Sequence, residues 1–185
     1  DGMDLVASCP NHMNPAMSYI APSNLGNLQV YSGIAPVSVG GDSIGGTIVA
    51  DSAAPEFAAP GAASINKGEV GAFYRSNNAA RGGNFSATHA EQFFNIRYDG
   101  SYSKANNYSA GDDFNGKTNT GRPGESTQPD EVASTAYETE SHALGMALKL
   151  GEDLLEMKLG YQHVPQELFA NQRMDMTDNT QERIS

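Results

Sequence analysis

Sulfur atoms give this chain its clearest chance of binding a metal ion. Cys9 and Met13 lie close together near the start of the sequence, and Met174 and Met176 flank a single residue much later in it. Thiolate and thioether sulfurs are soft donors that select Cu(I), whereas a zinc site usually recruits several Cys and His residues. Two short segments that converge on one ion would therefore favour copper.

Each of these residues also has a structural explanation that needs no metal. A single Cys is often a small buried apolar residue, Met commonly fills gaps in packing, and alternate Met residues on a strand simply face the same side. A histidine in a polar loop is often merely solvated. By residue type alone, the candidate metal ligands are Cys9, Met13, Met174 and Met176, with His12 and His163 as additional candidates.

Other chemistries find less support in the sequence. No Ser or Cys elbow accompanies His89, His142 or His163, so we expect no enzyme activity. The glycine-rich segment 40–46 lacks a Gly-Lys-Ser/Thr ending and precedes β-branched residues, which predicts a turn rather than a nucleotide site. The net charge of −11, with only 11 scattered basic residues, argues against a nucleic-acid partner.

The composition predicts a mainly β protein. The 185 residues include 20 Gly and no Trp, with 38% hydrophobic and 18% charged residues, so turns are favoured over helix formers. No stretch approaches the ~20 apolar residues of a membrane helix. Membrane β-strands remain possible, because their alternating pattern leaves no such run.

Alternation with a period of two is clearest beyond residue 68. Apolar residues share one face of each predicted strand, while the opposite faces carry polar residues such as Asn95, Arg97 and Asp99. The clearest hairpin spans residues 140–164 and turns near Gly151. The alternating apolar positions are Val70, Ala72, Tyr74, Phe94, Ile96, Tyr98, Tyr102, Leu144, Met146, Leu148, Leu150, Leu155, Met157, Leu159 and Tyr161.

The lengths of the connections distinguish the two ends of the predicted sheet. The turns near Ala90 and Gly151 are short, whereas the connection over residues 104–130 is long and polar. Short turns at one end and long loops at the other are typical of outer-membrane barrels, although a soluble β-sandwich can show the same pattern. We expect a compact unit with short strands over residues 1–52, a Pro-bearing linker over 53–67, and long strands over 68–185.

Two longer segments carry a family resemblance. The segment SNLGNLQVYSGIAPVSVGGDSIGGTIVADS resembles the end of the plug domain of TonB-dependent outer-membrane receptors. The segments GEVGAFYRSNNAARGGNF and EQFFNIRYDGSYSKANNYSAGDDF resemble the first barrel strands of the same family. This resemblance implies the C-terminal part of a plug followed by the first antiparallel strands of a transmembrane β-barrel. It also implies a fragment, with about six of the ~22 strands of such a barrel.

Within that family, CPNHMNPAMSYIAPSN and FANQRMDMTDN resemble the copper-receptor branch, which is OprC- and NosA-like. That branch implies a Cys-x-x-x-Met element in the plug, which Cys9 and Met13 match, and a second ligand pair in the barrel. The second pair of the branch is His-x-Met, so Met174-x-Met176 departs from it at its first position.

The function implied by the resemblance is gated import across the bacterial outer membrane. The plug and external loops would capture a copper ion, as Cu(I), and the TonB energy-coupling complex would move the plug through a segment upstream of Asp1. Two alternatives stay open. One is a receptor for a siderophore or another metal chelate, which would use aromatic and Arg residues in its loops. The other is a soluble β-sandwich binding module.

Overall fold

Antiparallel strands make up nearly all the regular structure in the part of the chain that is described. The computed structural model describes residues 18, 20–40, 45–116, 126–168 and 175–185. Within these ranges there are two short 3-10 helices, η2 (Pro22–Asn24) and η3 (Val37–Val39), and no α-helix. Neither helix of this described part has the length and apolar character needed to span a membrane. The prediction of a mainly β protein is confirmed.

Six strands form the main sheet, in the spatial order β10-β9-β8-β5-β4-β3. All neighbouring pairs are antiparallel, so the sheet is a meander with one long excursion between β5 and β8. Its strands are β3 (Ile65–Arg75), β4 (Ala80–Ala90), β5 (Phe94–Ala105), β8 (Tyr137–Leu150), β9 (Asp153–Glu167) and β10 (Asn179–Ile184).

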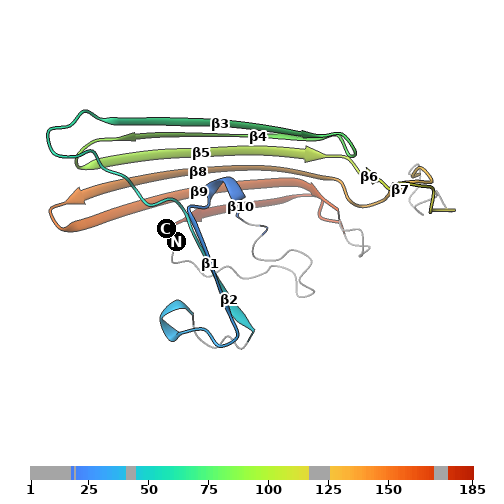
Figure 1. The fold of residues 1–185 in the computed structure, drawn as a ribbon, viewed down its shortest axis with the longest axis horizontal. Coiled ribbons are helices and arrows are strands. Elements are labelled where there is room, and N and C mark those ends of the chain that lie inside the picture. The colour runs from blue at the N-terminus through green and yellow to red at the C-terminus, as the bar shows by residue number, and fades with distance from the viewer. Residues whose placement is uncertain (1–17, 19, 41–44, 117–125, 169–174) are drawn as a thin grey trace.

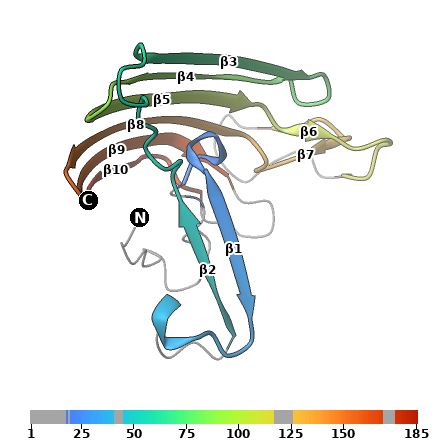
Figure 2. The same cartoon turned by 60° about the vertical axis from the view of Figure 1, so that its left-hand side comes forward.

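Two small hairpins complete the fold. β1 (Asn27–Ser32) pairs with β2 (Gly46–Asp51), and this hairpin projects from one side of the main sheet in both views (Figures 1 and 2). β6 (Tyr108–Ser109) pairs with β7 (Glu131–Val132) inside the excursion between β5 and β8. The short strands expected within residues 1–52 are therefore present as β1 and β2.

The predicted hairpin over residues 140–164 is also present. Leu144 lies opposite Leu159, Met146 opposite Met157 and Leu148 opposite Leu155, and Gly151 makes the turn with a φ of +71°. One predicted boundary differs from the structure. β3 begins at Ile65, inside the range 53–67 that we expected to be linker, because residues 65–67 pair with the last residues of β4.

The two ends of the main sheet differ in the length of their connections. Residues 91–93 and 151–152 form short turns at one end, here called the turn end. Three connections lie at the opposite end, here called the loop end: a short turn over residues 76–79 and two longer connections over residues 106–136 and 168–178. The segment leading from β2 into β3 arrives at the turn end, so the N-terminal region meets the sheet beside its short turns.

Candidate functional site

The main sheet has two chemically opposite faces. Successive residues of a strand point to opposite sides, and directly paired residues point to the same side, so the register assigns each residue to a face. We call one the apolar face; it carries Val70, Phe85, Phe94, Ile96, Tyr98, Leu144, Met146, Leu148, Leu155, Met157, Leu159 and Tyr161. The other is the polar face; it carries Asn84, Ser86, Thr88, Asn95, Arg97, Asp99, Ser101, Ser103, Thr139, Ser141, Lys158 and Gln162.

The apolar face is the exposed one. Val70 is 78% exposed, Leu155 58% and Phe85 47%, and Leu148 and Met157 are also exposed. A contiguous apolar surface that spans several strands is rare on a soluble monomer and marks contact with a membrane or another protein. This face is therefore the first candidate functional surface.

A row of four rings crosses the apolar face. The ring centroids are 6.2 Å apart for Phe85 and Tyr98, 6.0 Å for Tyr98 and His142, and 6.2 Å for His142 and Tyr161. The Tyr98 hydroxyl lies 2.6 Å from His142 Nδ1, so the polar atoms of the row are partly satisfied within it. Gly100 makes this possible, because a Cβ there would come within 2.9 Å of the Tyr98 hydroxyl.

The polar face is the covered one. Ser141 is 2% exposed, Asn95 and Gln162 are each 4% exposed, and Asp99 is 7% exposed. The buried apolar residues of the strands lie on the same face and are mostly alanine: Ala80, Ala90, Ala105, Ala147 and Val164. In the sheet, burial therefore follows small and polar side chains rather than large apolar ones.

The N-terminal region is fastened to the polar face by hydrogen bonds. Asn95 Nδ2 donates to the Glu56 carbonyl at 2.9 Å, and Gln162 Nε2 donates to the Ser18 carbonyl at 3.1 Å. The Ala58 amide donates to the Glu91 carbonyl at the turn end, at 3.0 Å. Side chains of two strands of the sheet thus hold the backbone of the N-terminal residues that cross the polar face. We call these residues, 18, 20–26 and 50–58, the covering segment.

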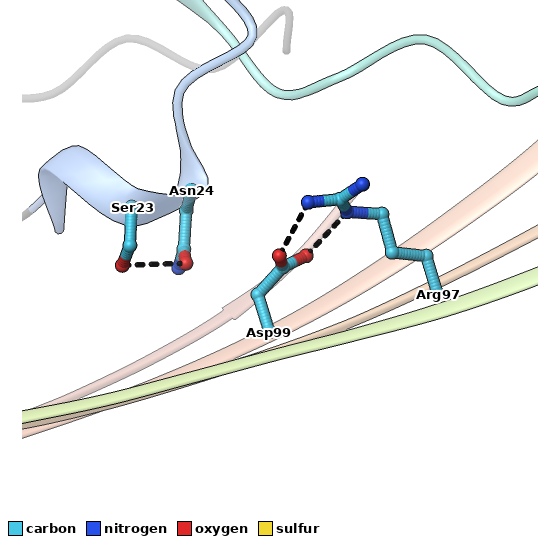
Figure 3. A network of polar contacts seen from close by, with 4 residues as sticks. All are labelled: Ser23, Asn24, Arg97 and Asp99. Carbon is cyan, nitrogen blue, oxygen red and sulfur yellow. Dashed lines mark hydrogen bonds and ion pairs between the residues drawn. The ribbon is translucent and has the colours of Figure 1, made fainter. Parts of the chain in front are cut away.

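An ion pair stands on the polar face where the covering segment crosses it. Arg97 Nε and Nη2 donate to the two carboxylate oxygens of Asp99, at 2.7 and 2.6 Å. Figure 3 shows both side chains on the side of the sheet where η2 carries Ser23 and Asn24. A bidentate pair of this kind is held in a fixed geometry, and it satisfies an otherwise costly charge beneath the covering segment.

The predicted sulfur site falls mostly on residues outside the described ranges. Cys9, Met13 and Met174, with the additional candidate His12, lie there. Met176 is described: its backbone amide and carbonyl both bond Glu167, each at 2.9 Å, which places it at the loop end beside the last residue of β9. The segment that carries Met176 therefore belongs to the end with the long connections.

His163 also lies near the loop end. Its Nε2 atom is 3.0 Å from Asp178 Oδ1. Among the described residues no three His, Cys, Asp or Glu side chains gather in a way that could hold a metal ion. That finding does not bear on methionine sulfurs or on Cys9, so the predicted set of sulfur ligands stays a prediction.

Sequence reasoning missed the contacts that fasten the covering segment. Alternation assigned Asn95 to the polar face of its strand, but its partner Glu56 is far away in the sequence and is reached through a backbone carbonyl, which carries no side-chain signal. The available hint was a polar residue at the start of a strand whose next positions on the same face are also polar.

A comparison of the chain with protein-family descriptions, curated proteins and solved structures found no match.

Proposed function

We propose that this chain forms part of the wall and plug of a TonB-dependent receptor in the bacterial outer membrane, and that the receptor imports copper as Cu(I). The main sheet would be wall and the N-terminal region plug. One observation carries the proposal: the sheet exposes its large apolar side chains and covers its small and polar ones. Lipid favours that arrangement, because it solvates the apolar face while a plug occupies the lumen.

The dimensions of the sheet agree with this proposal. A membrane-spanning β-strand needs about 9–11 residues, and the first five strands of the sheet have 11 to 15. Barrel closure would pair the two edge strands, β3 and β10, with further strands.

The position of the N-terminal region argues against the soluble β-sandwich. In a sandwich, a second sheet packs on the apolar face of the first. Here the covering segment is bonded to Asn95 and Gln162, which belong to the polar face. The described residues thus cover the side of the sheet that a sandwich would leave to water.

The copper cargo is supported by the sulfur donors. Met176 lies at the loop end, which would be the external side of the receptor because outer-membrane barrels carry their long loops outside. A soft ion captured there would be held between the plug sulfurs of Cys9 and Met13 and the wall sulfurs of Met174 and Met176. Energy from the TonB complex would then move the plug and release the ion inward.

Titration of the purified receptor with Cu(I), against a competing chelator, tests the cargo. We expect Cys9→Ala to weaken binding by more than the roughly 10–100-fold that is lost when a residue supporting a metal ligand is changed. Met176→Leu, which keeps volume but removes sulfur, should weaken it as well. Met146→Leu is the matched control, because Met146 lies on the apolar face and should leave the affinity unchanged.

An unchanged affinity in Cys9→Ala would contradict copper import through this site. It would instead favour a receptor for a siderophore or other metal chelate, whose ligand contacts would come from aromatic and Arg side chains. The proposed wall and plug would be unaffected by that result, because they depend on the two faces of the sheet and not on the cargo.

A further inference from the structure

A cavity lies between the polar face and the segment that covers it. Its volume is about 140 Å³. The sheet forms its floor with residues that have little or no side chain: Ala143, Gly145, Ala147 and Gly160. The covering segment forms its roof with mostly apolar residues: Ile20, Leu25, Ala53 and Ala54. The cavity exists because the small side chains of the sheet do not fill the distance to the covering segment. The hydrogen bonds from Asn95 and Gln162 fix that distance.

Arg183 closes one side of this cavity. It lies opposite Gly160 in the register, and its guanidinium group stretches over that glycine: a Cβ at Gly160 would come within 3.2 Å of Arg183 Nε and 3.5 Å of Nη2. The Arg183 side chain is half-buried, and the part of the chain that the structure describes gives it no hydrogen bond or ion pair.

The other cations that line the cavity have carboxylate partners. Arg97 is paired with Asp99 at 2.6 Å, and Lys158 lies 3.5 Å from Glu156. Among the described lining residues, Arg183 is therefore the cation whose donors remain available toward the cavity. A guanidinium presents its donors in a planar fork that matches a carboxylate, and such a bidentate pair is among the stronger hydrogen-bonded contacts in proteins.

From this geometry we propose that the cavity binds a small organic carboxylate with a compact apolar body, of about the size of one ring. Arg183 would hold the carboxylate, and the apolar body would lie over Ala143 and Ala147 beneath Leu25. The size follows from the volume, since an apolar protein cavity of about 150 Å³ accommodates benzene. Neither copper nor the membrane enters this inference, which concerns a ligand held between the covering segment and the sheet.

The site is also separate from Met176, the one predicted sulfur ligand that lies in the described part of the chain. Met176 lies at the loop end beside Glu167. Asn95 and Ala147, which line the cavity, are paired with each other near the turn end of β5 and β8. The cavity thus extends from the turn end to the middle of the sheet, whereas Met176 lies at the loop end, and the binding of a carboxylate and of copper can each be measured alone.

Calorimetric titration of the purified receptor with benzoate tests the site, with benzyl alcohol as the neutral probe of similar size. We expect benzoate to bind and benzyl alcohol to bind more weakly. Arg183→Gln should weaken benzoate binding by roughly tenfold to a hundredfold, the range for a lost hydrogen bond to a charged group. Ala143→Leu, which raises the floor and keeps Arg183, should also weaken it. Arg75→Gln removes an exposed arginine outside the cavity and should change nothing.

Several results would overturn the proposal. They are no benzoate binding to the unmodified receptor, equal affinity for benzyl alcohol, or an unchanged benzoate affinity in Arg183→Gln or Ala143→Leu. Should Arg183→Gln fail to fold, Arg183→Lys replaces it: the charge stays but the bidentate fork is lost, so weaker binding supports the site and unchanged binding contradicts it. Copper titration of the same samples keeps a failure here distinct from a failure of the proposed cargo.

Discussion

The two faces of the main sheet are built on the same strands, yet they follow opposite rules of burial. On β8, Leu144, Met146 and Leu148 stand on the apolar face, and Leu148 is 41% exposed. Between them, on the polar face, Ala147 is 3% exposed and Ser141, further along, is 2% exposed. In this sheet the large apolar side chains are exposed and the small or polar ones are buried. In a soluble protein the large apolar side chains fill the core instead.

This contrast indicates what each face has to contact. Burying a Leu or Met side chain stabilises a protein by about 1.5–3 kcal/mol, and the described structure leaves this contribution unused over most of the apolar face. A lipid environment would supply it. The polar face serves a different purpose, because its small and hydrogen-bonding side chains let a peptide segment approach closely and bond to Asn95 and Gln162.

The largest difference in stability between the two faces should appear when a charged residue is placed on each of them in turn. We expect Leu144→Arg to destabilise the protein folded in lipid vesicles by about 2–4 kcal/mol, the cost of an arginine at the membrane midplane. Thr139→Arg on the same strand, but on the polar face, should cost less than about 1 kcal/mol. Unfolding by guanidinium from vesicles measures both. Equal costs at the two positions would remove the distinction between the faces.

Removing a bond of the covering segment should have a smaller and more local effect. Asn95→Ala deletes the donor to the Glu56 carbonyl and should cost about 0.5–1.5 kcal/mol. The loss should appear as faster hydrogen exchange of the Ala58 amide, which bonds Glu91 nearby. Asn66→Ala is the control, since its exposed amide contacts His89 and Ser64, and exchange at Ala58 should not change. Protection of Ala58 that survives in Asn95→Ala would show that the covering segment is held otherwise.

The smallest effect is expected in the aromatic row. Tyr98→Phe keeps the ring and removes the hydroxyl that lies 2.6 Å from His142 Nδ1, which should cost about 0.5 kcal/mol because the pair is partly exposed. Tyr74→Phe, whose hydroxyl has no bond in the described structure, is the matched control and should be neutral. Vesicle unfolding can resolve the two variants. A neutral Tyr98→Phe would mean that ring stacking alone, and not the hydrogen bond, orders this row.

The sequence was most informative where local periodicity decides the structure. Leu144 to Leu150 and Leu155 to Tyr161 alternate strictly around the turn at Gly151, so the hairpin, its faces and its turn could all be predicted. The start of β3 at Ile65 was missed because Asn66 and Lys67 are polar and precede the alternating run. A strand at the edge of a sheet tolerates such residues, which hides its first positions from a pattern search.

The contacts on the polar face could not be predicted in the same way. Gln162 bonds the carbonyl of Ser18, and Arg183 crosses Gly160 from the neighbouring strand. Such contacts depend on how distant segments are placed in three dimensions, and a backbone acceptor or a glycine carries no distinctive local signal. The copper ligands belong to a third category, because they came from a resemblance in two short segments and not from periodicity.

Lipid accessibility along β9 is the sharpest check on a sheet that spans the membrane. Spin labels placed one at a time at residues 155 to 159, in a receptor with Cys9 replaced by Ser and reconstituted in vesicles, would report collisions with oxygen, which enters lipid, and with a water-soluble nickel complex. We predict high oxygen and low nickel accessibility at Leu155, Met157 and Leu159, and low oxygen accessibility at Glu156 and Lys158. High nickel accessibility at Leu155, Met157 and Leu159 would place the apolar face in water and contradict a wall that spans the membrane.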